Sequence, residues 1–178
     1  MKLHLGCGKC YIPEWTNLDI GICDGTRVDI IDDAKTLKTI GDSSCDLIYA
    51  SHILEHFDRY KYKDVLDVWF RKLREGGVLR LAVPDFDQVI KMYNKDSDMK
   101  SILGFLVGGQ TTKYDYHNMV FNRKGLTLDL LEAGFTEIRE WDWRNTSHTE
   151  YDDYSQAYFP HLEKENGTLM SLNLEAKK

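Results

Sequence analysis

Short apolar runs separated by polar turns dominate the first half of the chain. They lie at residues 2–5, 17–20, 28–31, 46–50 and 78–83, and they end near a glycine, a carboxylate or a proline. Short, uniformly apolar runs are typical of strands that are buried on both faces of a parallel sheet. We therefore predict a mainly parallel sheet from this half of the chain.

Two segments have the spacing of helices. The first has the i, i+3, i+4, i+7 pattern of one buried face, carried by Tyr62, Val65, Leu66, Trp69 and Leu73. We expect Gly76-Gly77 to end this helix, because glycine tolerates the left-handed conformation of a helix C-terminus. The second helix is predicted over about 124–133, with Gly134 as its stop.

The C-terminal part adds two strands, at 135–141 and at about 168–176. In the latter, apolar residues alternate with Ser171, Asn173 and Glu175, which predicts an antiparallel strand with one wetter face. Strands that alternate with helices before an antiparallel end indicate an α/β fold. We predict one domain, 1–178, built on a doubly wound, mostly parallel seven-stranded sheet with an antiparallel C-terminal strand.

Composition narrows the range of partners. The 178 residues carry a net charge of −6 without a Lys/Arg cluster, which argues against nucleic acid. No apolar run reaches the length of a membrane helix or of a signal peptide. We therefore expect a cytoplasmic protein that does not bind membranes.

The four cysteines, Cys7, Cys10, Cys23 and Cys45, all lie in the first quarter of the chain. This distribution does not suit a disulfide framework for a secreted domain. Cys7 and Cys10 form a C-x-x-C motif, which is compatible with half a zinc site or with a redox pair. No second close pair of cysteines completes a zinc site.

The most informative motif is the turn Gly6-Cys7-Gly8, which follows the first predicted strand. Glycines without a Cβ let the backbone approach a nucleotide-type cofactor at the end of a strand. The dinucleotide fingerprint G-x-G-x-x-G also needs a glycine at position 11, where this chain has Tyr11. A nicotinamide dehydrogenase is therefore disfavoured.

Carboxylates follow the next two predicted strands. Asp19 closes the second strand, where an acid can accept hydrogen bonds from ribose hydroxyls. Asp33 follows the third strand, where an acid can bind an adenine amino group, and Asp32 is the alternative if the register shifts by one. Acids in either place can also simply cap turns. Their order behind a G-x-G turn favours an adenosyl ligand.

These motifs together resemble the class I S-adenosylmethionine-dependent methyltransferases. The resemblance rests on Leu-His-Leu-Gly-Cys-Gly at 3–8, Trp-Thr-Asn-Leu-Asp at 15–19, Asp33-Ala34, and the segments 46–57 and 71–79. It is closest to the bacterial branch that includes O-methyltransferases of small molecules and glycans. It departs from the usual pattern between Gly6 and Asp19, where only 12 residues remain for a first crossover helix, which must be very short.

The resemblance implies S-adenosyl-L-methionine as the cofactor, no metal, and a small polar acceptor such as a hydroxyl of a sugar or glycan precursor. The implied cofactor-binding set is Leu5, Gly6, Cys7, Gly8, Asp19, Ile20, Asp33, Ala34 and Ser51. The segments 85–122 and 143–167 are expected to cover the substrate side. Residues 152–158 are rich in groups that bind sugars, and we expect them at the rim of the acceptor pocket.

Two histidines are candidates for a general base, because imidazole has a suitable pKa. His52 follows the fourth predicted strand, and His117 lies in a polar and aromatic run, where Asp115 or a tyrosine can hold its ring. His56 is expected to pack or cap. A surface-loop role for His117 fits the sequence equally well.

Two other functions are also compatible with the sequence. His52-x-x-Glu55-His56 matches the H-x-x-E-H pattern of zinc hydrolases, which requires both histidines on one helical face with Glu55 as the base. The chain also suits a non-catalytic protein that binds an adenosyl cofactor, in which neither histidine takes part in chemistry.

Overall fold

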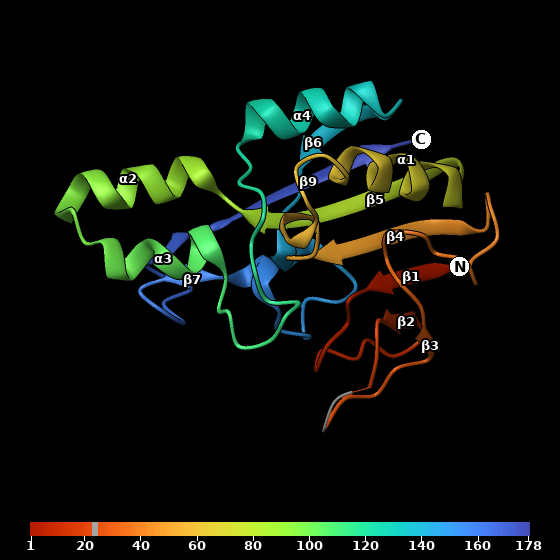
Figure 1. The fold of residues 1–178 in the computed structure, drawn as a ribbon, viewed down its shortest axis with the longest axis horizontal. Coiled ribbons are helices and arrows are strands. Elements are labelled where there is room, and N and C mark those ends of the chain that lie inside the picture. The colour runs from red at the N-terminus through yellow and green to blue at the C-terminus, as the bar shows by residue number, and fades with distance from the viewer. Residues whose placement is uncertain (23–24) are drawn as a thin grey trace.

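The computed structural model describes residues 1–22 and 25–178. One sheet holds seven strands in the order β3-β2-β1-β4-β5-β9-β6 (Figure 1). Their bounds are β1 Lys2–Leu5, β2 Thr16–Asp19, β3 Ile30–Ile31, β4 Cys45–Ser51, β5 Leu73–Pro84, β6 Thr136–Glu140 and β9 Ser171–Lys177. The pairs from β3 to β5 are parallel, and β9 runs antiparallel between β5 and β6. The predicted fold class is confirmed.

Four α-helices and a small hairpin complete the described elements. The helices are α1 Tyr62–Lys72, α2 Phe86–Asp96, α3 Met99–Val107 and α4 Arg123–Glu132. The short elements are the 3-10 helices η1 Leu54–His56, η2 Trp143–Asn145 and η3 Tyr154–Gln156 and the paired strands β7 Tyr158–Phe159 and β8 Thr168–Leu169. No helix in the described part of the chain is long and apolar enough to span a membrane.

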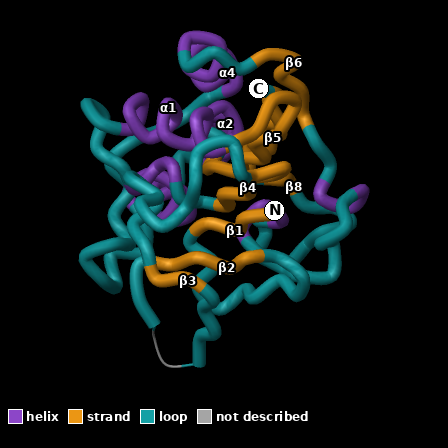
Figure 2. The backbone as a smooth tube through the Cα atoms, turned by 90° about the vertical axis from the view of Figure 1, so that its right-hand side faces the viewer, coloured by secondary structure: helices purple, strands orange, loops and turns teal. Residues whose placement is uncertain are grey.

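The two faces of the sheet are covered differently (Figure 2). Because side chains alternate along a strand, Leu79 and Leu81 of β5 enter the core under α1 and α4, where Trp69 and Leu126 are fully buried. The opposite face carries Tyr49, which packs with side chains from loops. The helices α1 and α4 therefore cover one face, and loops with the short 3-10 helices η2 and η3 cover the other.

The connection from β1 to β2 contains no helix, whereas the sequence predicts a very short one. A buried amide replaces it. Asn17 is fully buried, its Oδ1 accepts from the Ile12 amide at 3.0 Å, and its Nδ2 donates to the carbonyls of Ile12 and Trp15 at 2.9 and 3.1 Å. His4 Nδ1 also lies 3.1 Å from Oδ1. These bonds fix a loop that is too short for a stable helix.

Two predicted details are wrong. Helix α1 ends at Lys72, so Gly76-Gly77 does not end it. These glycines instead lie in the irregular first part of β5. A Cβ at Gly77 would lie 3.0 Å from the carbonyl oxygen of Cys45, so close strand packing explains this glycine. The second detail concerns β9, described next.

The polar residues of β9 do not face water. Ser171 and Asn173 are each 4% exposed and Glu175 is 7% exposed, because the segment after β6 covers them. They are satisfied by partners: Glu175 pairs with Arg80 at 2.6 Å, and Asn173 donates to the Ser155 carbonyl at 2.9 Å. The period of two therefore marks a buried polar face, since a buried polar group needs a hydrogen-bond partner.

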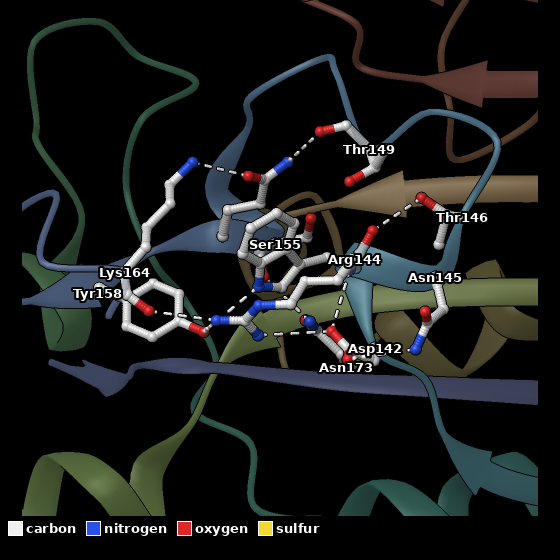
Figure 3. Close-up of polar contacts among 11 residues, drawn as sticks. Asp142, Arg144, Asn145, Thr146, Thr149, Ser155, Tyr158, Lys164 and Asn173 are labelled. Atoms are coloured by element: carbon white, nitrogen blue, oxygen red, sulfur yellow. Dashed lines mark hydrogen bonds and ion pairs between the residues drawn. The ribbon is translucent and has the colours of Figure 1, made fainter. Parts of the chain in front are cut away.

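Side-chain hydrogen bonds hold together residues 142–164, the segment that covers β9 and is called the covering segment below (Figure 3). Arg144 donates to the Tyr158 hydroxyl and to the Lys164 carbonyl, each at 3.1 Å. Lys164 in turn donates to Gln156 at 2.7 Å and to Asp152 at 2.9 Å. The loop is thus anchored although it has little regular structure.

We expect Asn17→Ala to destabilise the protein by about 3 kcal/mol, because it leaves buried backbone groups of the β1–β2 loop without partners. At this chain length the unfolding midpoint should fall by about 6–12 °C in a thermal melt. Asn94→Ala, on the exposed face of α2, is the control and should stay within about 0.5 kcal/mol. Equal effects of the two changes would contradict the role given to Asn17.

Candidate functional site

The carboxyl ends of β1, β2 and β4 meet at one edge of the sheet. Leu5 pairs with Leu18 and with Ala50, so Gly6, Asp19 and Ser51 come next along their strands at the same level. This is the edge of an open parallel sheet at which ligands bind, where the strand order reverses.

The glycine turn needs its glycines. Gly6 and Gly8 have φ of +57° and +51°, and a Cβ at Gly6 would collide with the side chain of Ile53. The Cys7 amide donates to the Leu18 carbonyl at 3.1 Å, which ties the turn to β2. The turn is therefore a rigid backbone surface without side chains at Gly6 and Gly8.

Asp19 faces this turn. Its Oδ2 accepts from the Gly8 amide at 2.8 Å and its Oδ1 from the Ile20 amide at 2.7 Å. A carboxylate has about four lone-pair sites, so two remain for a ligand's hydroxyls.

The two acids after β3 differ in their partners. Asp32 accepts from the amide and the hydroxyl of Thr39, each at 2.7 Å, and from the Asp33 amide. Although burial raises the pKa of Asp32, these bonds leave it below its usual range. Among the described residues Asp33 accepts a side-chain hydrogen bond at Oδ1 alone, from the Lys35 amide at 2.9 Å. Asp33 therefore keeps more lone-pair sites open to a ligand than Asp32 does.

Two cavities flank the turn, and Gly6 lines both. The first cavity, of about 470 Å³, is lined by Gly6, Leu18, Asp19, Ile20, Asp32, Asp33, Ala34, Lys35, Ile53, His56, Phe57, Lys113, Tyr114, Tyr116 and Asn118. The second cavity, of about 560 Å³, is lined by His4, Gly6, Cys7, Gly8, Lys9, Cys10, Ser51, Phe105, Asp152, Asp153, Tyr154, Gln156, Ala157, Tyr158, His161 and Leu162. Both volumes are typical of small-molecule sites.

The two cavities bring together most of the residues that the sequence suggests. The first cavity has four of them, Asp19, Ile20, Asp33 and Ala34, in addition to Gly6. Cys7, Gly8 and Ser51 line the second. Leu5 lines neither, because its side chain is fully buried in the main core.

Sequence reasoning missed the central position of Asp153. Its carboxylate accepts from the Tyr49 hydroxyl at 2.6 Å and from Ser51 Oγ at 3.2 Å, while it caps η3 through the Ser155 amide. It thereby joins the covering segment to the end of β4. The available signal was the run 152–158, which does line the second cavity, mostly with acidic and aromatic side chains.

The candidate bases lie deeper than expected. His52 has φ of +52° and a side chain only 8% exposed, and burial, together with His117 and His56, lowers its pKa to about 3. The side chain of His117 is 9% exposed, and burial lowers its pKa as well. Neither His52 nor His117 lines the first or the second cavity.

Other contacts of these histidines also differ from the prediction. His117 Nδ1 lies 3.0 Å from the Phe105 carbonyl, so neither Asp115 nor a tyrosine holds its ring, and Asp115 binds Thr111. His56, assigned to packing or capping, lines the first cavity.

The zinc-hydrolase motif lacks its helix. Only Leu54–His56 is helical there, as one 3-10 turn, and the positive φ of His52 places that residue before it. The premise of two histidines on one helical face is therefore wrong.

The thiols of Cys7 and Cys10 are partly shielded from solvent. Burial raises the pKa of Cys7 to about 12 and that of Cys10 to about 11, so both stay protonated at neutral pH. Cys45 is a free thiol in the core. Cys23 lies outside the described residues.

Glu55 is a buried carboxylate near this edge of the sheet. Its side chain is fully buried, and neither carboxylate oxygen has a hydrogen-bond partner among the described residues. Burial raises its pKa to about 8. Nothing in the apolar periodicity marks this residue, which sequence reasoning considered only within the hydrolase motif.

Comparison with known proteins adds the fold class. No known sequence family matches the chain, and no curated protein matches it. A SAM-dependent methyltransferase structure from Archaeoglobus fulgidus is 17% identical with a TM-score of 0.61, over 99% of this chain and 85% of that one. One from Methanosarcina mazei is 20% identical with a TM-score of 0.59, over 99% and 91%.

A third similar structure is a 1,6-didemethyltoxoflavin-N1-methyltransferase from Burkholderia thailandensis, with bound 1,6-didemethyltoxoflavin and S-adenosylhomocysteine. It is 15% identical with a TM-score of 0.58, over 99% of this chain and 70% of that one. The chain therefore has the fold of the class I S-adenosylmethionine-dependent methyltransferases.

The pKa of Glu55 predicts a pH dependence of stability. The folded value, about 8, lies above the unfolded value of about 4.3, so the folded state holds a proton that the unfolded state has lost. The free energy of unfolding in EDTA should then fall by up to about 1.4 kcal/mol per pH unit from about pH 6.5 to 8. The buried histidines oppose this trend only below that range. Denaturant titrations measure the slope.

Glu55→Gln should remove this slope, since a neutral amide cannot titrate. Glu75→Gln, at an exposed carboxylate of β5, loses the same charge and should keep it. A slope that persists in Glu55→Gln would show that another group carries it.

Proposed function

We propose that this chain is an S-adenosylmethionine-dependent methyltransferase that acts on a small polar acceptor, such as a hydroxyl of a sugar or glycan precursor. The observation that carries the proposal is the position of Gly6, which lies between an acid-edged cavity and a cavity lined by acidic and aromatic residues.

The first cavity suits the adenosyl part of the cofactor. Asp33 has an oxygen for the adenine amino group, and Asp19 has two lone-pair sites for the ribose hydroxyls. The methionine part would follow the Gly6-Cys7-Gly8 turn, where the backbone is bare. The residues present thus fit each part of the ligand.

The second cavity suits an uncharged polyol. Asp152 and Asp153 can accept hydrogen bonds from hydroxyls, and Tyr154 and Tyr158 offer aromatic surfaces. Asp152 and Asp153 disfavour a phosphate or carboxylate next to them, although Lys9 also lines this cavity. The acidic lining therefore favours a neutral sugar-like acceptor.

When bound, the cofactor supplies a methyl group activated by a sulfonium. The protein then has mainly to align the acceptor oxygen with that methyl group, since the displacement is in line. Such a transfer would join the acceptor oxygen to the methyl carbon, release S-adenosylhomocysteine and pass the hydroxyl proton to solvent water. Asp153 lines the second cavity and is our proposed group for orienting this hydroxyl.

The roles of His52 and His117 as bases are harder to support. Neither ring lines the second cavity, and the ring of Tyr154, which does line it, stands 5.4 Å from the ring of His52. A non-catalytic role for both histidines predicts that their replacement changes stability alone.

S-adenosylhomocysteine should stabilise the protein, because a ligand that binds only the folded state shifts unfolding. At about 100 times its dissociation constant it adds about 2.7 kcal/mol, which raises the thermal midpoint by about 5–10 °C. No shift at millimolar ligand would refute the cofactor assignment.

Two variants locate the binding. Asp19→Ala and Asp33→Ala should each weaken binding of S-adenosylhomocysteine by about 10- to 100-fold in calorimetry, since each removes charge-assisted hydrogen bonds. Asp67→Ala, at an exposed carboxylate of α1, should leave the affinity unchanged.

Turnover tests the acceptor side separately. Release of S-adenosylhomocysteine should appear with neutral sugars or oligosaccharides from an acceptor panel. Asp153→Asn should lower kcat by about 10- to 100-fold while cofactor affinity stays normal, with Asp67→Asn as the charge control. Binding of the cofactor without turnover on any acceptor would favour the non-catalytic alternative.

A further inference from the structure

A cluster of atoms that can bind a metal ion lies at the first cavity, on residues other than those proposed to bind the cofactor. One carboxylate oxygen of Glu55 and one ring nitrogen each of His56 and His117 all lie within 4.8 Å of one another. Glu55 is fully buried, and both of its oxygens are without hydrogen-bond partners among the described residues. A buried charge in this state requires a proton or a cation.

The hydrogen bonds of the two rings fix which nitrogens are available. His56 Nδ1 lies 3.1 Å from the Tyr116 carbonyl, and His117 Nδ1 lies 3.0 Å from the Phe105 carbonyl. A carbonyl can only accept, so each Nδ1 carries the hydrogen and each neutral ring keeps a lone pair on Nε2. His117 Nε2 is 4.0 Å from Glu55 Oε1. The Nε2 lone pair of His117 therefore faces Glu55, and this pair shares at most the single proton that Glu55 can carry.

His52 adds a third acceptor. Asn173 Nδ2 donates to the Ser155 carbonyl, so its Oδ1 accepts the single proton of the Ser171 hydroxyl at 2.8 Å. His52 Nε2, 3.1 Å from Ser171 Oγ, must then be the donor in that bond. The lone pair of His52 Nδ1 consequently faces Glu55 Oε1 at 3.3 Å. One proton cannot satisfy all of these acceptors, whereas a cation can bind several at once.

We propose that Glu55, His56 and His117 form a binding site for a divalent transition-metal ion such as Zn²⁺. Two imidazoles and one carboxylate are a ligand set that zinc uses with one position left open. Bond lengths of 2.0–2.1 Å require ligand atoms about 3.3 Å apart, so the side chains need to close inward by about 1 Å. The Nδ1 bonds to backbone carbonyls are the outer contacts that orient metal-binding histidines.

The backbone holds the ligand-bearing segments together without any ion. The amides of Asn118 and Met119 donate to the Glu55 carbonyl at 2.8 and 3.1 Å, and Asn118 Nδ2 donates to the His56 carbonyl at 2.8 Å. His117 is therefore fixed beside η1 although 60 residues separate it from His56 in the sequence. Preorganised ligands lose little entropy when an ion binds.

The open coordination position would face the first cavity, because His56, Tyr116 and Asn118 line it. This triad differs from the H-x-x-E-H pattern, since His117 takes the place of His52. His52 touches Glu55 instead and would act as a positioning residue.

Titration with Co²⁺, a spectroscopic substitute for Zn²⁺, tests the site on the metal-free full-length protein. We expect one equivalent to bind and to give visible ligand-field bands of a nitrogen and oxygen site. Glu55→Gln, His56→Gln and His117→Gln should each weaken binding by at least about 100-fold. His161→Gln, at an exposed histidine, should leave it unchanged.

The cysteine pair provides the competing outcome. Intense sulfur-to-cobalt bands, or binding lost in Cys10→Ser but kept in the three triad variants, would place the ion at Cys7 and Cys10 and overturn the proposal. Absence of stoichiometric binding would do the same.

A fold control separates loss of the site from loss of structure. His56 is only partly buried, so His56→Gln should keep the far-ultraviolet circular dichroism of the parent protein. Zn²⁺ at about 100 times its dissociation constant should raise the thermal midpoint of the parent by about 5–10 °C and leave that of His56→Gln unchanged. An equal rise in both would refute the triad. None of these readouts requires cofactor binding or turnover.

Discussion

The buried amide of Asn17 is the constraint on which the proposed cofactor site depends. A doubly wound sheet ordinarily places a helix between its first two strands, and that helix fixes the glycine turn. Here two residues of β2 hold the loop: Asn17 binds its far end at Ile12, and Asp19, the last residue of the strand, binds its near end at Gly8. Two side chains of one short strand thus replace the crossover helix.

Side-chain contacts also replace α-helices on the face of the sheet that carries Tyr49. Loops cover it, so its polar groups must be paired or neutral. Arg80 forms an ion pair with Glu175 and also contacts His148 at 3.0 Å, while burial, with Arg80 next, lowers the pKa of His148 to about 4. The acidic segment that lines the second cavity is attached to this face through Tyr49 and Asp153. The packing of this segment on the sheet therefore also determines the shape of the second cavity.

The sequence predicted the sheet well because its strands are short and apolar, and strand ends place residues reliably. Strand ends place the predicted cofactor residues at one edge of the sheet: Gly6 directly follows β1, Asp19 is the last residue of β2, and Asp33 lies two residues after β3. Tertiary partners could not be predicted. The alternation in β9 indicated a polar face but not its cover, because Asn173 donates to Ser155 in the short 3-10 helix η3, which no apolar periodicity marks.

The histidines show the same limit at the site. Spacing placed His52 next to the end of β4, which is where it lies, but exposure decides whether a ring can meet a substrate. His52 and His117 turn inward to Glu55, and His56 faces the first cavity instead. The sequence can show which side chains share a face only where a helix or strand repeats its pattern. The single 3-10 turn Leu54–His56 is too short for such a pattern, so the directions of these histidines could not be predicted.

The position of Glu55 links the two cavities through the histidines around it. His117 is held by the carbonyl of Phe105, whose side chain lines the second cavity, while His56 lines the first. Removing charges from water is costly, and replacing a buried ionic group with an apolar one is often neutral or stabilising. A leucine at position 55 would therefore serve folding at least as well as the carboxylate. A carboxylate at this position is therefore explained by a cation that neutralises it. The two rings proposed to share that cation are His56, which lines the first cavity, and His117, which contacts Phe105 in the wall of the second cavity.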